Sequence, residues 1–346
     1  MPLLSRRVLP ILQLTRMALV FTAIADSTCT FLLWAKINQL KYSPQSQLLQ
    51  TLDAGDARKL GAVVVMSIGL YGFGMSLNDI IDRRRDRQIS PARPLPSGRV
   101  GVVAAHIICV ALGLAALLAG AYYMRATPHG WMSLALVVGT ILLITFYDFA
   151  GKYLVAPGLL SLGLIRFFHA LIPAPRIPLI WHPLLLLNHV TLLSLIAYRL
   201  EEKRPPLTRI HGWAVLGGLG LMDVAVIGIL ALRRVPELTP FAVTDALWVR
   251  WGLLLPIIAV VLFVVVAWTI RQRAGSAREA GQRMMLAGLL WLIVYDAAFV
   301  AGYVSWMLGL VLLLLLPVAW AAVRIMRWWS KLLAAPTKQT FRRVES

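Results

Sequence analysis

Long apolar segments fill most of this chain and constrain its fold more than any other feature. A last apolar block, 284–327, is too long for one membrane span, and Gly302 and Ser305 predict a turn inside it. The pattern therefore predicts an all-α, multi-pass transmembrane bundle of nine or ten helices. The remaining apolar segments of spanning length lie at about 11–35, 59–82, 101–124, 131–149, 153–173, 183–200, 211–232 and 247–270.

Composition supports a membrane protein and argues against nucleic-acid binding. Hydrophobic residues make up 59% of the 346 residues and charged residues only 14%, which is more apolar matter than a soluble chain of this length needs. The formal net charge is +19, but the basic residues lie between apolar segments and form no basic face interleaved with aromatics. We therefore expect a single transmembrane domain over residues 1–346 that does not bind nucleic acid.

The two cysteines, Cys29 and Cys109, lie in apolar segments with no His at ligand spacing, and we interpret both as packing residues.

The distribution of Lys and Arg predicts the orientation. With the N-terminus inside, the inner segments carry 24 Lys and Arg and the outer loops carry 9, while Arg166 lies within a span. This bias predicts that both termini are cytoplasmic. The basic tail, 331–346, is expected to lie on anionic lipid headgroups.

An acidic motif closes the second apolar segment. Asn78, Asp82 and Asp86 are spaced four residues apart, so a helix places them on one face with Asp79 beside them. Carboxylates that lie so near one another repel each other unless a cation lies among them. The neighbouring arginines are one candidate, and Mg²⁺, which prefers hard oxygen ligands and substrate phosphates, is the other.

Two basic residues further along are candidate ligand contacts. Lys152 follows Tyr147 and Asp148 at the inner end between two segments, where it either contacts a ligand or extends to the interface. Arg166 lies deep in the next segment, where it either lines a polar cavity or pairs with a buried acid.

The sixth apolar segment ends in a second charged stretch with Arg199, Glu201 and Glu202. By itself it is typical of a solvated helix end. It gains interest because the predicted topology places it at the same membrane face as the Asn78–Asp86 motif. Three further acids, Asp26, Asp223 and Asp296, lie deep in apolar segments; we interpret them as helix-packing groups rather than an ion-transport path, because no paired broken helices accompany them.

The Asn-Asp-x-x-Asp-x-x-x-Asp pattern at 78–86, followed by Arg-Pro-Leu-Pro-Ser-Gly at 93–98, resembles the first signature of the UbiA family of membrane prenyltransferases. The resemblance runs from about 16 to 204. It implies a bundle around a central cavity open to lipid, in which two acidic stretches hold Mg²⁺ and the diphosphate of an isoprenoid donor. Carried over by position, it implies metal contacts at Asn78, Asp79, Asp82 and Asp86, and diphosphate contacts at Asn78, Arg93, Tyr147 and Lys152.

The second acidic motif departs from the family pattern, since Pro205 stands four residues after Glu201. The resemblance still assigns Glu201 and Glu202 to the metal, and Arg166 and Arg199 to the diphosphate. Gly163-x-x-Arg166 with the Arg-x-Glu end at 199–201 is similar to a bacterial subgroup of the family, which implies a bacterial inner membrane.

The implied activity is Mg²⁺-dependent transfer of a prenyl group from an isoprenoid diphosphate to an acceptor within the membrane. Asp82, Asp86, Tyr147 and Lys152 are the expected catalytic residues. The reduced second motif also allows a non-catalytic protein that binds or moves a lipid or pigment precursor. The expected partners are the diphosphate donor and membrane lipid, and protein partners are left unknown.

Overall fold

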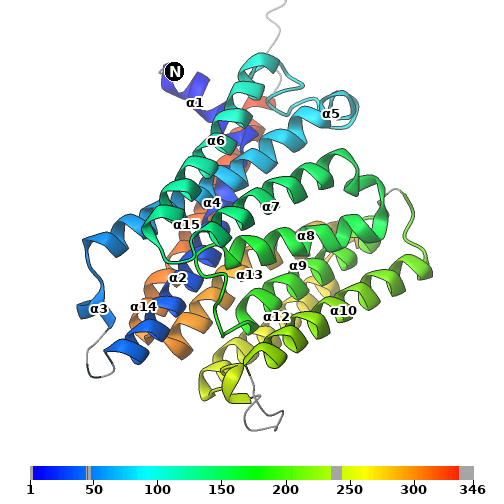
Figure 1. Ribbon diagram of the computed structural model, residues 1–346. Coiled ribbons are helices and arrows are strands. Elements are labelled where there is room, and N and C mark those ends of the chain that lie inside the picture. Colours follow the sequence, from blue (N-terminus) through cyan, green and yellow to red (C-terminus); the bar gives the residue numbers. More distant parts are fainter. Residues whose placement is uncertain (1–2, 44, 46–47, 204, 235–243, 335–346) are drawn as a thin grey trace, which may run out of the picture.

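The computed structural model describes residues 3–43, 45, 48–203, 205–234 and 244–334, and within them every regular element is a helix (Figure 1). Most of the predicted tail lies outside these residues. The elements are α1 Leu3–Leu14, η1 Met17–Leu19, α2 Val20–Tyr42, α3 Leu48–Thr51, α4 Ala54–Ile81, α5 Arg83–Ile89, α6 Val102–Ala126, α7 Trp131–Phe149, η2 Gly151–Tyr153, α8 Val155–Leu171, α9 Trp181–Leu200, α10 Arg209–Arg234, η3 Trp251–Leu253, α12 Leu254–Arg273, α13 Ala277–Tyr303, α14 Trp306–Leu313 and α15 Leu315–Ala334.

The predicted transmembrane bundle is confirmed. Nine helical stretches in the described part of the chain are long and apolar enough to cross a membrane, and α8, with 17 residues, is a shorter apolar helix beside them. The turn expected near Gly302 and Ser305 lies between α13, which ends at Tyr303, and α14, which begins at Trp306. The last apolar block therefore forms two antiparallel spans.

Burial divides the helices into a centre and a periphery. Within the most apolar stretch of each helix, 61% of the residues of α9 and 56% of those of α13 are buried. The corresponding shares are only 17% for α10 and 11% for the span that contains α12. The peripheral helices expose large apolar side chains such as Val103, Leu221 and Val261. An apolar outer surface is stable only against lipid, because water would penalise it at roughly 25 cal/mol per Å².

The helix ends place the functional residues together. The C-terminal ends of α4, α7 and α9 and the start of α8 lie around one polar cavity, which is lined by Asp82, Lys152, Val155 and Tyr198 among others. We call this side of the bundle the acidic end. Alternating helix direction, which short connections impose, brings residues more than a hundred positions apart in sequence to this end.

Close backbone contact fixes α4 against α6. A Cβ at Gly69 would lie 2.7 Å from the carbonyl oxygen of Leu112 and 2.9 Å from the backbone nitrogen of Ala116, so only glycine fits there. Small residues at helix contacts are a common device in membranes, because packing replaces the hydrophobic effect between helices.

Replacing this glycine should separate the two helices. We expect Gly69→Ala to lose about 1–3 kcal/mol of stability through overpacking. Gly61→Ala on the same helix, where a Cβ would meet nothing within 4 Å, serves as the matched control and should be neutral or slightly stabilising. Thermal unfolding in detergent measures both; equal midpoints for the two variants would contradict this packing account.

Candidate active site

Two connected cavities extend from the acidic end into the bundle. The first, which we call the mouth, has a volume of about 340 Å³ and includes Asn78, Asp82, Asp86, Arg93 and Lys152 in its lining. The second, which we call the chamber, has a volume of about 300 Å³ and reaches deeper. Both are lined by Asn78, Tyr147, Leu162, Ser194 and Met285, so they are parts of one space.

The acidic motif keeps its helical spacing although α4 ends at Ile81. The backbone nitrogen of Asp82 donates to the oxygen of Asn78 at 2.9 Å, and that of Asp86 donates to the oxygen of Asp82 at 2.8 Å. The chain therefore continues with helical hydrogen bonds from α4 into α5. Asn78, Asp82 and Asp86 all line the mouth, in agreement with the expected common face.

Lysine from another helix end neutralises the centre of the motif. Lys152 Nζ donates to Asp82 Oδ1 at 2.6 Å, and both side chains are largely buried. Lys152 lies in the short turn η2 after α7, and this turn directs it back over the mouth. Of the two interpretations of Lys152, the structure places it inside the cavity rather than extended to the interface.

The loop after α5 folds back over the remaining acids. Arg93 Nη1 lies 2.5 Å from Asp86 Oδ2 and 3.7 Å from Asp79 Oδ1, while Arg16 Nη2 approaches Asp79 Oδ1 at 3.3 Å. The loop turns at Gly98, whose φ of +74° favours glycine. Sequence reasoning assigned no site role to Arg16, which lies just before η1 and reaches Asp79 because α1 contacts α4.

An oxygen cluster lies at the junction of mouth and chamber. When the NH₂ group of Asn78 faces the two carboxylates it donates to Asp82 Oδ2 at 3.3 Å and to Asp148 Oδ1 at 3.1 Å. If the amide is turned by half a rotation, the Asn78 side-chain oxygen faces Asp82 Oδ2 and Asp148 Oδ1, and the three oxygens surround one point. Such a donor set fits Mg²⁺, which takes oxygen ligands almost exclusively. Asp148 was not expected here; its position four residues before Lys152 on a helical end was the available signal.

The second acidic stretch lies outside the mouth. Glu201 packs against α13, where its Cγ lies 2.9 Å from a Cβ built on Gly281, and its carboxylate pairs with Lys203 at 3.5 Å. The backbone of Glu202 has a φ of +49°, so the helix ends there and the chain turns away. Neither Glu201, Glu202 nor Arg199 lines the mouth or the chamber, whereas their neighbours Tyr198 and Lys203 do.

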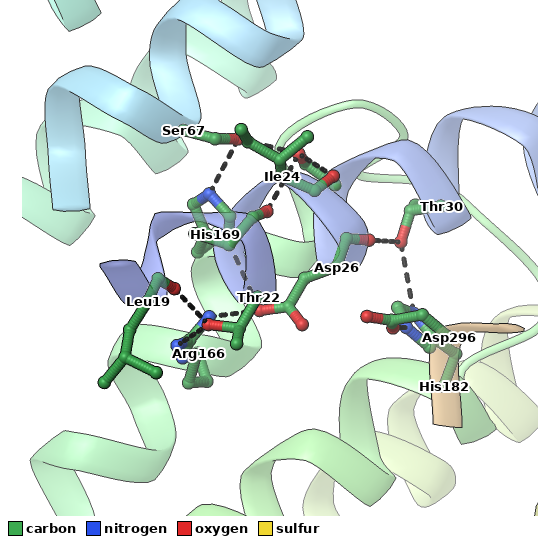
Figure 2. A network of polar contacts seen from close by, with 12 residues as sticks. Leu19, Thr22, Ile24, Asp26, Thr30, Ser67, Arg166, His169, His182 and Asp296 are labelled. Atoms are coloured by element: carbon green, nitrogen blue, oxygen red, sulfur yellow. Dashed lines mark hydrogen bonds and ion pairs between the residues drawn. The ribbon is translucent and has the colours of Figure 1, made fainter. Parts of the chain in front are cut away.

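Arg166 lies at the deep end of the chamber. Its Nη1 donates to Asp26 Oδ2 at 2.5 Å and its Nη2 donates to the hydroxyl of Thr22 at 2.8 Å (Figure 2). Both interpretations of this residue hold, because it pairs with a buried acid and also lines the chamber. His169, a neighbour of Arg166 in the lining, bonds to Ser67 through Nε2 at 3.1 Å. By contrast Asp223 accepts a bond from Asn188 at 2.9 Å and lines neither cavity.

Known proteins match this chain in sequence and fold. The sequence profile of the UbiA prenyltransferase family matches residues 47–174. Digeranylgeranylglyceryl phosphate synthase of Methanopyrus kandleri is 30% identical over 257 residues, which cover 69% of this chain and 89% of that protein. A solved digeranylgeranylglyceryl phosphate synthase has the same fold, with a TM-score of 0.58 and 18% identity over 86% of this chain and 99% of its own. A UbiA homolog from Archaeoglobus fulgidus bound to GPP and Mg²⁺ is more distant, with a TM-score of 0.43 and 11% identity over 91% of this chain and 99% of its own.

The protein is a multi-pass membrane prenyltransferase. It belongs to the UbiA prenyltransferase family, as its identity to the Methanopyrus relative over two thirds of the chain shows. The family match confirms the resemblance carried by the Asn78–Asp86 and Arg93–Gly98 motifs.

Removing the deep cation should destabilise the bundle. Arg166→Met leaves the fully buried Asp26 carboxylate without its partner, which is expected to cost about 3–5 kcal/mol. The double variant Arg166→Met/Asp26→Asn removes the charge as well and should recover most of the loss. Thermal unfolding in detergent tests this, and a double variant no more stable than Arg166→Met would contradict the ion pair as the cause.

Proposed function

We propose that the mouth and chamber form the site where this prenyltransferase transfers an isoprenoid group from its diphosphate to the hydroxyl of a phosphate-bearing acceptor. The observation that carries the proposal is the cluster of Asn78, Asp82, Asp86 and Asp148 beside Lys152 and Arg93, at the opening of a largely apolar space. Diphosphate chemistry needs this combination, because the leaving group is polyanionic and the prenyl group is hydrocarbon.

The proposed ligands of Mg²⁺ are Asn78, Asp82 and Asp86, supported by Asp79, with Asp148 added on the basis of its position. A bound Mg²⁺ would supply charge neutralisation for the departing diphosphate. Glu201 and Glu202 lie outside the mouth in this structure and form no part of this proposal.

The basic side chains of the mouth are placed to receive the diphosphate. Lys152 and Arg93 hold carboxylates in the structure, and their donors face the same opening. Charge-assisted hydrogen bonds from these groups to the diphosphate oxygens would strengthen as the carbon–oxygen bond breaks, which lowers the barrier. We propose Tyr147, which borders both cavities, as a further diphosphate contact. Arg166 and Arg199 are further proposed diphosphate contacts; in this structure Arg166 is paired with Asp26, and Arg199 lies outside both cavities.

The chamber is suited to a carbocation-like transition state. When the donor's C1–O bond breaks, the electron pair leaves with the diphosphate and C1 becomes cationic. Apolar and aromatic walls, which include Leu70, Tyr71, Ile144 and Leu289, keep water from quenching it. The acceptor oxygen then forms the new bond to C1, and its proton passes to a carboxylate at the mouth. Each buried CH₂ of the prenyl tail would add about 0.8 kcal/mol to donor binding.

A third cavity of about 1,110 Å³ suggests the chemical class of the acceptor. Four arginines, Arg16, Arg93, Arg99 and Arg324, line it, and Asp79 is the one acid among its lining residues. Burial lowers the pKa of the Arg99 guanidinium because it disfavours the charged form, and an anionic ligand would stabilise that charged form. We call this the arginine pocket; it shares Arg16 with the chamber. A lipid with a glyceryl phosphate headgroup, as the name of the Methanopyrus relative implies for that protein, fits this charge.

We further propose a bacterial plasma membrane with both termini and the acidic end on the cytoplasmic side. The excess of Lys and Arg in the connections at that end supports this orientation. Water-soluble diphosphate and Mg²⁺ would then reach the mouth from the cytoplasm.

The carboxylates should be essential for ionisation of the donor. We expect Asp82→Asn and Asp86→Asn each to lower Mg²⁺-dependent diphosphate release from a prenyl diphosphate by at least about 10²-fold, because each removes charge stabilisation of the leaving group. Asp223→Asn, which changes an acid outside both cavities, is the matched control and should retain activity. Full release by both mouth variants would exclude this site as the place of reaction.

The arginine pocket should determine acceptor preference. We expect Arg324→Gln to raise the KM for a glyceryl phosphate acceptor about 10-fold, because a hydrogen bond to a charged group is worth about 1.5–3 kcal/mol. The KM for the diphosphate donor should stay unchanged. Arg273→Gln, which removes an exposed arginine of α12 outside the pocket, is the control. An uncharged alcohol used as well as the phosphate-bearing one would contradict the acceptor class while leaving the transfer site intact.

A further inference from the structure

A second polar cluster lies beyond the Arg166–Asp26 pair and has no part in the proposed reaction. Cys29 of α2, His182 of α9 and Asp296 of α13 each direct a ligand atom to it, and these atoms lie within 4.8 Å of one another. All three residues are fully buried. Figure 2 shows the carboxylates of Asp26 and Asp296 pointing toward each other at the same place.

His182 has hydrogen-bond partners at both ring nitrogens, and one of its two tautomers leaves Nε2 with a lone pair. The hydroxyl of Thr30 donates to the backbone oxygen of Asp26 at 3.4 Å, so its oxygen is free to accept from His182 Nδ1 at 3.2 Å. With the ring proton on Nδ1, Nε2 presents its lone pair to Asp296. This arrangement, in which a polar group orients the opposite ring nitrogen, is the usual support of a metal-binding histidine.

Two carboxylate oxygens in the cluster have no donor. Asp26 Oδ1 and Asp296 Oδ2 are buried and form no hydrogen bond, while Asp296 Oδ1 lies 2.6 Å from His182 Nε2. With the ring proton on Nδ1, a single proton on Asp296 serves either His182 or Asp26 and leaves the other acceptor open to a cation. With the ring proton on Nε2, His182 donates to Asp296 and the Asp296 proton serves Asp26, so without a metal the cluster is a proton-sharing network.

We propose that this cluster binds a divalent transition metal of the zinc type, with Cys29 Sγ, His182 Nε2 and carboxylate oxygens of Asp296 and Asp26 as ligands. A thiolate with an imidazole selects zinc-like ions over Mg²⁺. The charges balance, because a divalent ion and Arg166 together offset one thiolate and two carboxylates. Binding releases the protons of Cys29 and Asp296. Zinc would separate His182 Nε2 and the Asp296 oxygen from 2.6 Å to about 3.3 Å, a small rotation of the carboxylate.

The ion would join three helices at the centre of the bundle. It would connect α2, α9 and α13, whose apolar windows are the most buried of the candidate spans. It would also hold the Asp26 carboxylate, which accepts the hydrogen bond from Arg166 at the deep end of the chamber. The site is therefore a structural cross-link that supports the floor of the chamber, and it does not depend on the proposed function of the mouth.

Cobalt substitution tests the site directly. The full chain is produced in cells grown with Zn²⁺ or with Co²⁺, so that the metal enters during folding, and purified in detergent with Mg²⁺ present. We expect about one tightly held ion per chain by elemental analysis, and in the cobalt form a thiolate-to-cobalt charge-transfer band with tetrahedral d–d bands. Co²⁺ at the mouth cannot produce the thiolate band, because no cysteine is among the residues that line it.

Matched cysteine variants assign the ligand. Cys29→Ser should lose the charge-transfer band and most of the bound metal, whereas Cys109→Ser, which changes the other buried cysteine, should keep both. If Cys29→Ser fails to fold, the wild-type spectrum still decides. A wild-type protein from either medium that contains no zinc or cobalt, or a cobalt form without a thiolate band, would overturn the proposal and leave a proton-sharing network at this place.

Discussion

Charges inside this bundle are neutralised across helices, and the arrangement of the site depends on that constraint. An ion isolated in a low-dielectric interior costs several kcal/mol, so each buried acid needs a partner that the fold must bring to it. Lys152 meets Asp82 at 2.6 Å and Arg166 meets Asp26 at 2.5 Å, and each pair joins helices far apart in sequence. The pairs thereby fix how the ends of α4 and α7, and the middles of α2 and α8, lie together.

The pairs differ in what they are able to do. Asp26 is fully buried, and Arg166 beside it is 12% exposed, so this pair is held in place as part of the bundle. At the mouth Arg93 is 37% exposed, so solvent and ligands reach it directly, and the largely buried Lys152 faces the same cavity. There, the basic side chains Lys152 and Arg93 can exchange their carboxylate partners for diphosphate oxygens at a small cost in free energy. A rigid deep pair and exchangeable outer pairs suit a site that must keep its shape while its polyanionic ligand comes and goes.

Much of the fold and part of the site follow from local patterns. Apolar segment lengths predict the helices, and the turn between α13 and α14 falls at the small residues that indicated it. The spacing of Asn78, Asp82 and Asp86 predicts their common face because helical periodicity alone sets it. Sequence reasoning also gave Arg166 a buried acidic partner as one of two possibilities, but three acids were available and only the packing of α2 on α8 selects Asp26.

Features that arise between distant elements were missed for a physical reason. Spacing rules detect ligands on one helix or loop, whereas His182 reaches Cys29 only because α9 packs into the centre. From the sequence alone, Cys29 was therefore interpreted as a packing residue. Similarly, Glu201 and Glu202 share a membrane face with the mouth, yet the chain turns at Glu202 and directs Glu201 onto α13, which no local pattern indicates.

An experimental structure with a non-cleavable prenyl thiodiphosphate and Mg²⁺ tests the central claim most directly. The account predicts that the diphosphate occupies the mouth, that Lys152 Nζ leaves Asp82 to bind its oxygens, and that Arg166 stays on Asp26. A diphosphate bound outside the mouth, with Lys152 still paired to Asp82, would contradict it.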